Sequence, residues 1–190
     1  FWQPNAVYID PSFLKTLPKR EFSAGVAEII KMAVTFNYDF FEWIENNSFI
    51  DEENIKTAIQ KSVETKAWVV SQDERERGLR AALNYGHTFG HVIENETNYK
   101  TYLHGEAVGI GMVMANEVAV EIGLMTKNEA NRVKILLEKY DIPTTYSIND
   151  VDGFYEHFFL DKKSMDNKIK FILPKSIGSC EITDTISEEI

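Results

Sequence analysis

Residues 84–91 read NYGHTFGH, and residues 104–106 read HGE. These two stretches hold three of the four histidines in the 190 residues, namely His87, His91 and His104. In a helix, His87 and His91 share one face and lie about 6 Å apart, because they are separated by four positions. Two neutral imidazoles at this spacing suit a divalent transition metal ion, and a third ligand from elsewhere would leave one position open for a substrate. The stretch therefore predicts a helix that carries a catalytic metal site.

A carboxylate is needed to complete this site, since two histidines alone rarely bind a metal ion tightly. Glu28 is the most informative candidate because it lies in an apolar helical pattern, GVAEIIK at residues 25–31. Burying a carboxylate there is costly unless it is paired or metal-bound. Lys31 shares its helix face, so a simple Glu28–Lys31 ion pair explains the acid equally well. The acids nearest to the histidines in the sequence are Glu94, Glu96 and Glu106. The histidines have their own structural alternative, as helix caps or core residues.

Composition and charge restrict the class of protein. A 44% hydrophobic and 26% charged chain of 190 residues is typical of a globular domain with one sizeable core. The net charge of −10 argues against a nucleic-acid or membrane-surface partner. The single cysteine, Cys180, excludes an intramolecular disulfide framework and fits a reducing cytoplasm. The longest apolar run, residues 107–115, is about half of what a membrane span requires.

Apolar periodicity predicts a mainly α domain with a small β-hairpin near the C-terminus. Weak alternation at residues 5–10, ended by Pro11, predicts an entering strand. Two runs separated by Pro174 and Gly178 predict the hairpin, at residues 168–173 and 179–183. The predicted helices cover residues 20–46, 51–72, the histidine stretch, 104–122, 127–140 and 150–159. The sequence contains neither a P-loop nor a GxGxxG dinucleotide motif.

Isolated basic residues form a second group of candidates in this acidic chain: Lys66, Arg80, Lys162 and Lys163. Such charges are usually used for binding anions: an arginine guanidinium binds a carboxylate, and lysine ammonium groups bind a phosphate. Taken singly, each is also explained as an ordinary surface residue. Asn84, one helical turn before His87, either hydrogen-bonds a substrate oxygen or caps the helix.

In their order and spacing, these segments resemble the C-terminal helical domain of the 3-dehydroquinate synthase family. The resemblance extends over most of the chain, and its most specific block runs from Lys66 to His91. The other motifs that carry it are PNAVYIDP at residues 4–11, LPKREF at 17–22, AGVAEIIK at 24–31, HGE at 104–106 and DKK at 161–163. Several ordered motifs of this kind do not arise together by chance.

The resemblance implies a role for each candidate residue. It implies that the zinc ligands are Glu28, His87 and His104. It further implies that Lys31 binds the substrate near the metal ion and that Lys66 and Arg80 bind its carboxylate. Asn84 is implied to bind the hydroxyl and phosphate region, and His91 to transfer or position a proton near the phosphate. One of Lys162 and Lys163 is implied to contact the phosphate. Glu76, one turn before Arg80, is implied to organise the metal-side network.

The resemblance also implies the reaction. The family converts 3-deoxy-D-arabino-heptulosonate 7-phosphate to 3-dehydroquinate and phosphate, through transient oxidation of a ring hydroxyl with NAD and a zinc or cobalt ion. The family's N-terminal NAD-binding domain has no counterpart in residues 1–190, which begin with Phe1. We therefore expect a single metal- and substrate-binding domain that is inactive alone. Its expected partners are a sugar phosphate, its own N-terminal domain, which would bind most of the NAD, and a second copy in a homodimer.

Three other functions share parts of this pattern. Metal-dependent alcohol and glycerol dehydrogenases would not need the cations at Lys66 and Arg80. Cyclases such as 2-deoxy-scyllo-inosose synthase act on glucose 6-phosphate, which has no carboxylate, so Arg80 would lack an anionic partner. A structural zinc domain usually uses four protein ligands, often cysteines, and this chain has one cysteine.

Overall fold

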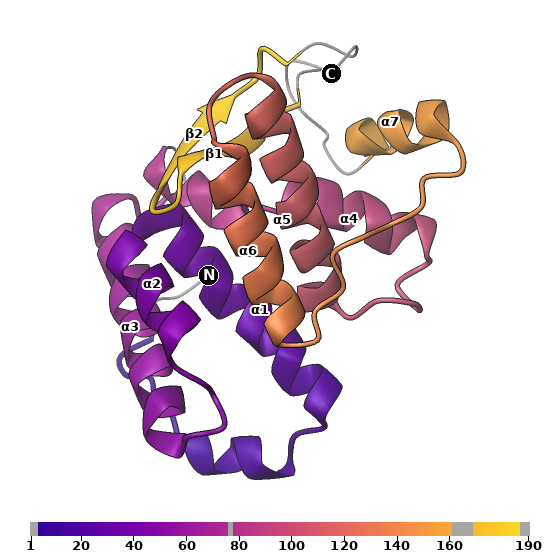
Figure 1. The fold of residues 1–190 in the computed structure, drawn as a ribbon. Helices are drawn as coiled ribbons and strands as arrows, with labels where there is room; N and C mark the ends of the chain where they lie inside the picture. Colours follow the sequence, from indigo (N-terminus) through magenta and orange to yellow (C-terminus); the bar gives the residue numbers. More distant parts are fainter. Residues whose placement is uncertain (1–3, 76–77, 161–168, 187–190) are drawn as a thin grey trace.

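Helix α5 (His104–Glu121) runs through the middle of the fold and is packed against α1, α4, α6 and β1 (Figure 1). The structure is a computed structural model that describes residues 4–75, 78–160 and 169–186. The other elements within these residues are η1 (Pro11–Thr16), α1 (Lys19–Phe36), α2 (Tyr38–Asn46), α3 (Glu52–Gln72), η2 (Leu79–Asn84), α4 (His87–Glu96), α6 (Lys127–Lys139), α7 (Val151–Leu160), β1 (Phe171–Ser176) and β2 (Ser179–Thr183). The prediction of a mainly helical domain with a C-terminal hairpin is confirmed.

Side chains on nearly every face of α5 are buried, from Gly105 to Ala119. An apolar helix without a polar face is expected to lie inside a protein rather than on its surface. The core around it includes Ile30 of α1, Ile93 of α4 and Leu137 of α6, each completely buried. Because α1 and α4 both contact this central helix, residues of the three helices are brought close together. None of the described helices combines the length and apolar character needed to cross a membrane.

Two glycines of α5 allow its backbone to touch its neighbours. A Cβ on Gly105 would overlap the carbonyl oxygen of Ala24 in α1, and one on Gly111 would overlap the carbonyl oxygen of Gly86. Gly86 also adopts a left-handed conformation, with φ of 80°, immediately before α4. This close packing sets the distances between α1, α4 and α5. It occurs where the motifs AGVAEIIK, NYGHTFGH and HGE lie side by side in the fold.

Three predictions about the elements are wrong in detail. Residues 5–10 form no strand, since no described strand lies beside them to complete their hydrogen bonds, and Tyr8 is 95% exposed. The helical pattern over residues 20–46 is two helices, because the Asn37 side chain accepts a hydrogen bond from the Phe40 amide (2.9 Å) and starts α2. Pro174 does not end the first hairpin strand but lies within β1, opposite Cys180.

The hairpin accommodates this proline because each strand of a two-stranded sheet has a free edge. Its pairing becomes irregular between Pro174 and Ser176, and Gly178, with φ of 91°, forms the turn as expected. The Gly178 amide also donates a hydrogen bond to the carbonyl of Val34 in α1 (2.7 Å), which fixes the hairpin on the helical core. Lys168, the first residue of the predicted strand, lies outside the described residues.

Candidate metal centre

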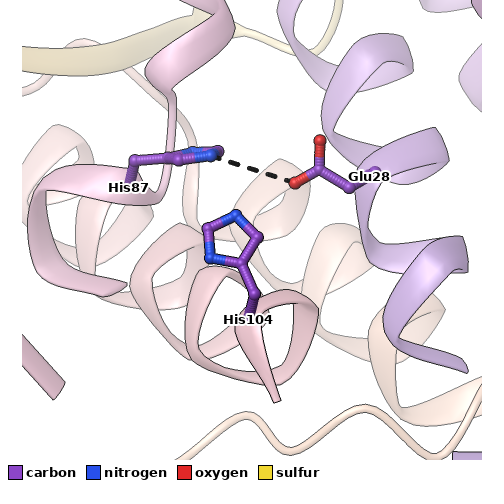
Figure 2. A group of neighbouring side chains, drawn as sticks. All are labelled: Glu28, His87 and His104. Carbon is purple, nitrogen blue, oxygen red and sulfur yellow. Dashed lines mark ion pairs between the residues drawn. The ribbon is translucent and has the colours of Figure 1, made fainter. Parts of the chain in front are cut away.

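Glu28, His87 and His104 converge from α1, α4 and α5 (Figure 2). One nitrogen or oxygen atom from each lies within 4.8 Å of the others. Glu28 Oε1 is 4.0 Å from His87 Nε2, and the two imidazole rings are 5.0 Å apart between centroids. Ligands around a tetrahedral zinc ion are about 3.4 Å from one another, given bonds of about 2.1 Å. The three side chains therefore need only a small adjustment to hold one ion.

The two histidines are placed by the starts of their helices, whereas Glu28 lies in the middle of α1. His87 is the first residue of α4, directly after the left-handed Gly86. His104 is the first residue of α5, whose start is stabilised because the Glu106 carboxylate accepts a hydrogen bond from the Leu103 amide (2.8 Å). Glu106 is in turn bound by Arg20 at the start of α1, at 2.5 and 2.6 Å. The helix that carries Glu28 and the helix that carries His104 are thus joined at their ends.

His87 is held in the form that a metal ion requires. Burial, together with the nearby ammonium of Lys31, lowers the pKa of His87 to about 4, so the ring is neutral at pH 7. Its Nδ1 lies 3.3 Å from the carbonyl oxygen of Tyr85, which only accepts hydrogen bonds. The proton of the neutral ring therefore belongs on Nδ1, and the lone pair of Nε2 faces Glu28.

Glu28 presents one oxygen without a hydrogen-bond partner in the described part of the chain. Its Oε2 accepts a hydrogen bond from the buried ammonium of Lys31 at 2.6 Å, whereas its Oε1 is buried and unpartnered. Burial raises the pKa of Glu28, but the charge and the hydrogen bond of Lys31, together with the nearby His87 and His104, outweigh burial and lower the pKa overall. A carboxylate oxygen and an imidazole lone pair thus face each other with no proton between them. A cation between the two satisfies both.

The predicted Glu28–Lys31 ion pair is present, but it involves only Oε2 of the carboxylate and leaves the buried Oε1 without a hydrogen-bond partner among the described residues. Lys31 is itself almost completely buried, and burial lowers the pKa of Lys31 despite the acid beside it. A simple surface pair at three positions' spacing would lie in solvent. The pairing therefore orients Glu28 toward the histidines in addition to neutralising it.

A cavity of about 230 Å³ adjoins these residues. Glu28 and Lys31 of α1 line one side of it, and Ser62 and Lys66 of α3 line another. The structure therefore brings together two of the predicted substrate-binding lysines, Lys31 and Lys66, which are 35 positions apart in the sequence. A cavity with two ammonium groups and a candidate metal site suits a small anionic molecule.

The structure describes two of the remaining predicted site residues, Arg80 and Asn84. Arg80 lies on η2, where its guanidinium donates to the carbonyl of Glu74 (2.6 Å) and its amide to the Asp73 carboxylate (3.1 Å). Asn84 is the last residue of η2, and Gly86 occupies the N-cap of α4, so the alternative that Asn84 caps this helix is wrong. Glu76, Lys162 and Lys163 lie outside the described residues.

The sequence analysis did not predict that Glu94 contacts two of the histidines. This carboxylate accepts hydrogen bonds from two histidine rings, at 2.8 Å from His91 Nδ1 and 3.0 Å from His104 Nδ1. The i, i+3 spacing of His91 and Glu94 was a signal for the first contact. The second contact joins α4 to the start of α5 and was not visible in the spacing.

The fold and this site define a helical domain in which three potential ligands for a divalent metal ion lie beside a cavity lined by two lysines. Residues 25–164 match the family described as 3-dehydroquinate synthase C-terminal. The chain belongs to this family, and the resemblance found in the sequence is confirmed. It is 67% identical over 190 residues to the 3-dehydroquinate synthase of a Sulfurovum species and 62% identical over 189 residues to that of a Nitratiruptor species. Each alignment covers 100% of this chain and 54% of the relative, so the chain spans about half the length of the curated relatives it matches.

Two solved structures have the same fold. One is 2-epi-5-epi-valiolone synthase from Streptomyces hygroscopicus subsp. jinggangensis 5008, with NAD+ and Zn2+ bound; the TM-score is 0.84 and the identity 25%, over 95% of this chain and 51% of that one. The other is 2-deoxy-scyllo-inosose synthase complexed with carbaglucose-6-phosphate, NAD+ and Co2+. Its TM-score is 0.71 and its identity 26%, over 92% of this chain and 50% of that one.

Proposed function

We propose that this chain is the metal- and substrate-binding half of an enzyme that converts 3-deoxy-D-arabino-heptulosonate 7-phosphate to 3-dehydroquinate and phosphate. The observation that carries the proposal is the unpartnered Glu28 oxygen facing the Nε2 lone pair of His87, with His104 alongside and a two-lysine cavity adjoining. Membership of the 3-dehydroquinate synthase C-terminal family supports the choice of reaction.

The proposed ligands for the metal ion are Glu28, His87 and His104. When bound, a divalent ion supplies Lewis acidity to the substrate oxygen that it contacts. Lys31 holds the Glu28 carboxylate in place and contributes positive charge to the cavity, and Lys66 adds a second ammonium group from α3. These cations orient an anionic substrate, so that its reacting bonds lie in a fixed position relative to the metal site.

The finer roles rest on the family resemblance. Arg80 would bind the substrate carboxylate as a bidentate pair, and Asn84 would bind a hydroxyl or phosphate oxygen. His91 would transfer or position a proton near the phosphate, using the ring nitrogen that does not face Glu94. Further proposed contributions come from Glu76, in the metal-side network, and from Lys162 or Lys163, at the phosphate.

We also propose that the enzyme uses NAD and zinc or cobalt, with NAD bound mainly by an N-terminal domain. The solved structures of similar fold were obtained with NAD+ and with Zn2+ or Co2+. A homodimer in the cytoplasm is the proposed state of the protein, and the single cysteine is compatible with a reducing compartment.

A second candidate is a cyclase that acts on glucose 6-phosphate, favoured by the similarity to 2-deoxy-scyllo-inosose synthase. Two observations weigh against it. The identity to that protein is 26%, against 67% to the 3-dehydroquinate synthase of Sulfurovum. Glucose 6-phosphate also offers no carboxylate to Arg80.

Phosphate release by the natural-length protein tests the proposal. The protein is given the heptulosonate phosphate or glucose 6-phosphate, each with NAD and zinc. We expect release from the heptulosonate alone, abolished by His87→Ala and strongly reduced by Arg80→Ala. Lys127→Ala, at an exposed position of α6, is the matched control and should leave the rate unchanged. Release from glucose 6-phosphate alone would establish the second candidate, and release from neither would favour a dehydrogenase.

A further inference from the structure

Glu94 lies within α4, and its side chain is only 8% exposed although it carries a charge. Its two oxygens face two imidazole rings, with Oε2 2.8 Å from His91 Nδ1 and Oε1 3.0 Å from His104 Nδ1. These are ordinary lengths for N–H···O hydrogen bonds. An ionised carboxylate only accepts such bonds, so the proton of each neutral ring belongs on Nδ1.

This arrangement determines which nitrogen of His104 is free. With Nδ1 bound to Glu94, the lone pair is on Nε2, at the other side of the ring. Figure 2 shows that one ring nitrogen of His104 is directed toward His87 and Glu28. Since Nδ1 is held by Glu94, the nitrogen that meets the other two ligands is Nε2.

We propose that Glu94 is a positioning residue for the metal site, which fixes the tautomer and the orientation of the His104 ring. The inference rests on the proposed function, since it assumes that His104 is a metal ligand. A carboxylate on the far nitrogen also makes the ring a stronger electron donor, and loss of such a partner typically weakens metal binding or activity by about 10–100-fold.

The second candidate ligand is held in the same way by a different acceptor. His87 Nδ1 lies 3.3 Å from the Tyr85 carbonyl oxygen, so both rings have Nδ1 on an acceptor and Nε2 toward Glu28. The backbone holds one ring, and the Glu94 side chain holds the other. Only the Glu94 contact can be removed by a side-chain substitution, which makes it open to a direct test.

Glu94 contacts His91 as well, so one carboxylate joins a metal-ligand ring and a ring proposed to act on the substrate. His91 and His104 lie 5.9 Å apart between centroids with planes 27° apart. His91, Glu94 and His104 are also close enough to hold a metal ion themselves. Because that ion would need the two Nδ1 atoms that our proposal assigns to hydrogen bonds, the two arrangements exclude each other at His104.

The test uses the natural-length protein and the variant Glu94→Gln, with Glu96→Gln as the matched control. A glutamine has one accepting oxygen and one NH2 group, so it cannot accept from both rings, and an NH2 facing a ring imposes the wrong tautomer. Glu96 is on the same helix and is also largely buried, but its oxygens face Tyr146 and His157. Zinc affinity is measured by competition with a chelator, zinc content is counted per chain, and the cobalt form is examined by visible absorption.

We expect Glu94→Gln to weaken zinc binding about 10–100-fold and to alter the cobalt spectrum, with Glu96→Gln unchanged on both measures. Wild-type affinity and spectrum in Glu94→Gln would overturn the proposal. Two zinc ions per chain, reduced to one by Glu94→Gln, would overturn it in favour of a metal ion bound by Glu94 itself. A wild-type protein that binds no zinc would overturn the proposed metal site together with this inference, whereas tight zinc binding that ignores Glu94 would overturn the inference alone.

A second measurement does not depend on whether a variant folds. In wild-type protein labelled with 15N-histidine, the two ring nitrogens of His104 are distinguished by their chemical shifts. We expect the proton on Nδ1. A His104 ring protonated on Nε2 in the metal-free protein would overturn the proposal.

Discussion

Gly105 of α5 lies against the backbone of Ala24 in α1, so closely that a Cβ would overlap the Ala24 carbonyl oxygen. Glu28 follows Ala24 by one helical turn, and His104 directly precedes Gly105. The contact between these two residues therefore sets the distance between a proposed carboxylate ligand and a proposed histidine ligand.

Gly105→Ala should force α1 and α5 apart, lower the free energy of unfolding by about 1–3 kcal/mol and weaken zinc binding. Thermal unfolding and zinc competition measure the two effects. Gly25→Ala is the matched control, because a Cβ there meets no atom within 4 Å. That change in a helix interior should stabilise the protein by about 0.5–1 kcal/mol. Equal behaviour of the two variants would refute the role of the close contact.

Metal removal should destabilise the protein. An ion that binds only the folded state adds about 2.7 kcal/mol when its concentration is 100 times its Kd. Excess chelator should therefore lower the unfolding temperature, and zinc or cobalt should restore it. Glu28→Gln should lose most of this response, since its amide is a poorer ligand than the carboxylate. An unfolding temperature that does not respond to chelator would count against a metal site.

Lys66→Ala should impair substrate binding without affecting the metal ion. Lys66 lines the cavity beside Glu28 and Lys31, but it belongs to α3 and is not a candidate ligand. Loss of one charged contact, worth about 1.5–3 kcal/mol, predicts a rise in KM of roughly 10–100-fold at unchanged zinc affinity. Lys56→Ala, on the same helix and paired with Glu53 at 2.7 Å, should change neither quantity. A normal KM in Lys66→Ala would remove this lysine from the substrate site.

The Cys180 thiol should react slowly with alkylating reagents. Burial raises the pKa of Cys180 to about 11. At pH 8 its thiolate fraction is then on the order of 100-fold below that of an ordinary cysteine, and the thiolate is the reactive form. Alkylation at pH 8 should therefore be correspondingly slow and should accelerate as the pH rises toward 11 or when the protein is unfolded. Rapid labelling of the folded protein at pH 8 would contradict this.

The 190 residues alone should bind zinc but release no phosphate. Their sequence lacks a GxGxxG motif, and the described residues contain no parallel sheet of the kind that binds dinucleotides. The same phosphate assay, supplied with NAD and zinc, measures this. Turnover by the isolated chain would show that the reaction needs no further domain.

Much of the fold was predictable because its signals are local. The acids that start α3, the histidine helix α4 and the hairpin turn at Gly178 follow from neighbouring residues. The break at Asn37 was missed because the apolar pattern continues across it. The extended backbone of Asn37 ends α1, and its side chain caps the start of α2 by accepting a hydrogen bond from the Phe40 amide. The strand expected at residues 5–10 was wrong because alternation alone does not supply a partner strand.

The candidate site likewise has residues that the sequence indicated and a contact that it did not. The histidine pair was visible in its spacing, and Glu28 stood out as an acid in an apolar pattern. The structure places them together, while their role as ligands remains a prediction. The Glu94–His104 contact was not predictable because it depends on how α4 packs against α5, and that packing is set by glycines such as Gly111.

The most direct test of the central claim is a crystal structure of the natural-length protein with zinc, with anomalous scattering measured at the zinc absorption edge. We predict one strong peak about 2.0–2.2 Å from a Glu28 oxygen and from the Nε2 atoms of His87 and His104. No peak between these three residues, or a peak held by His91 and Glu94, would contradict the account.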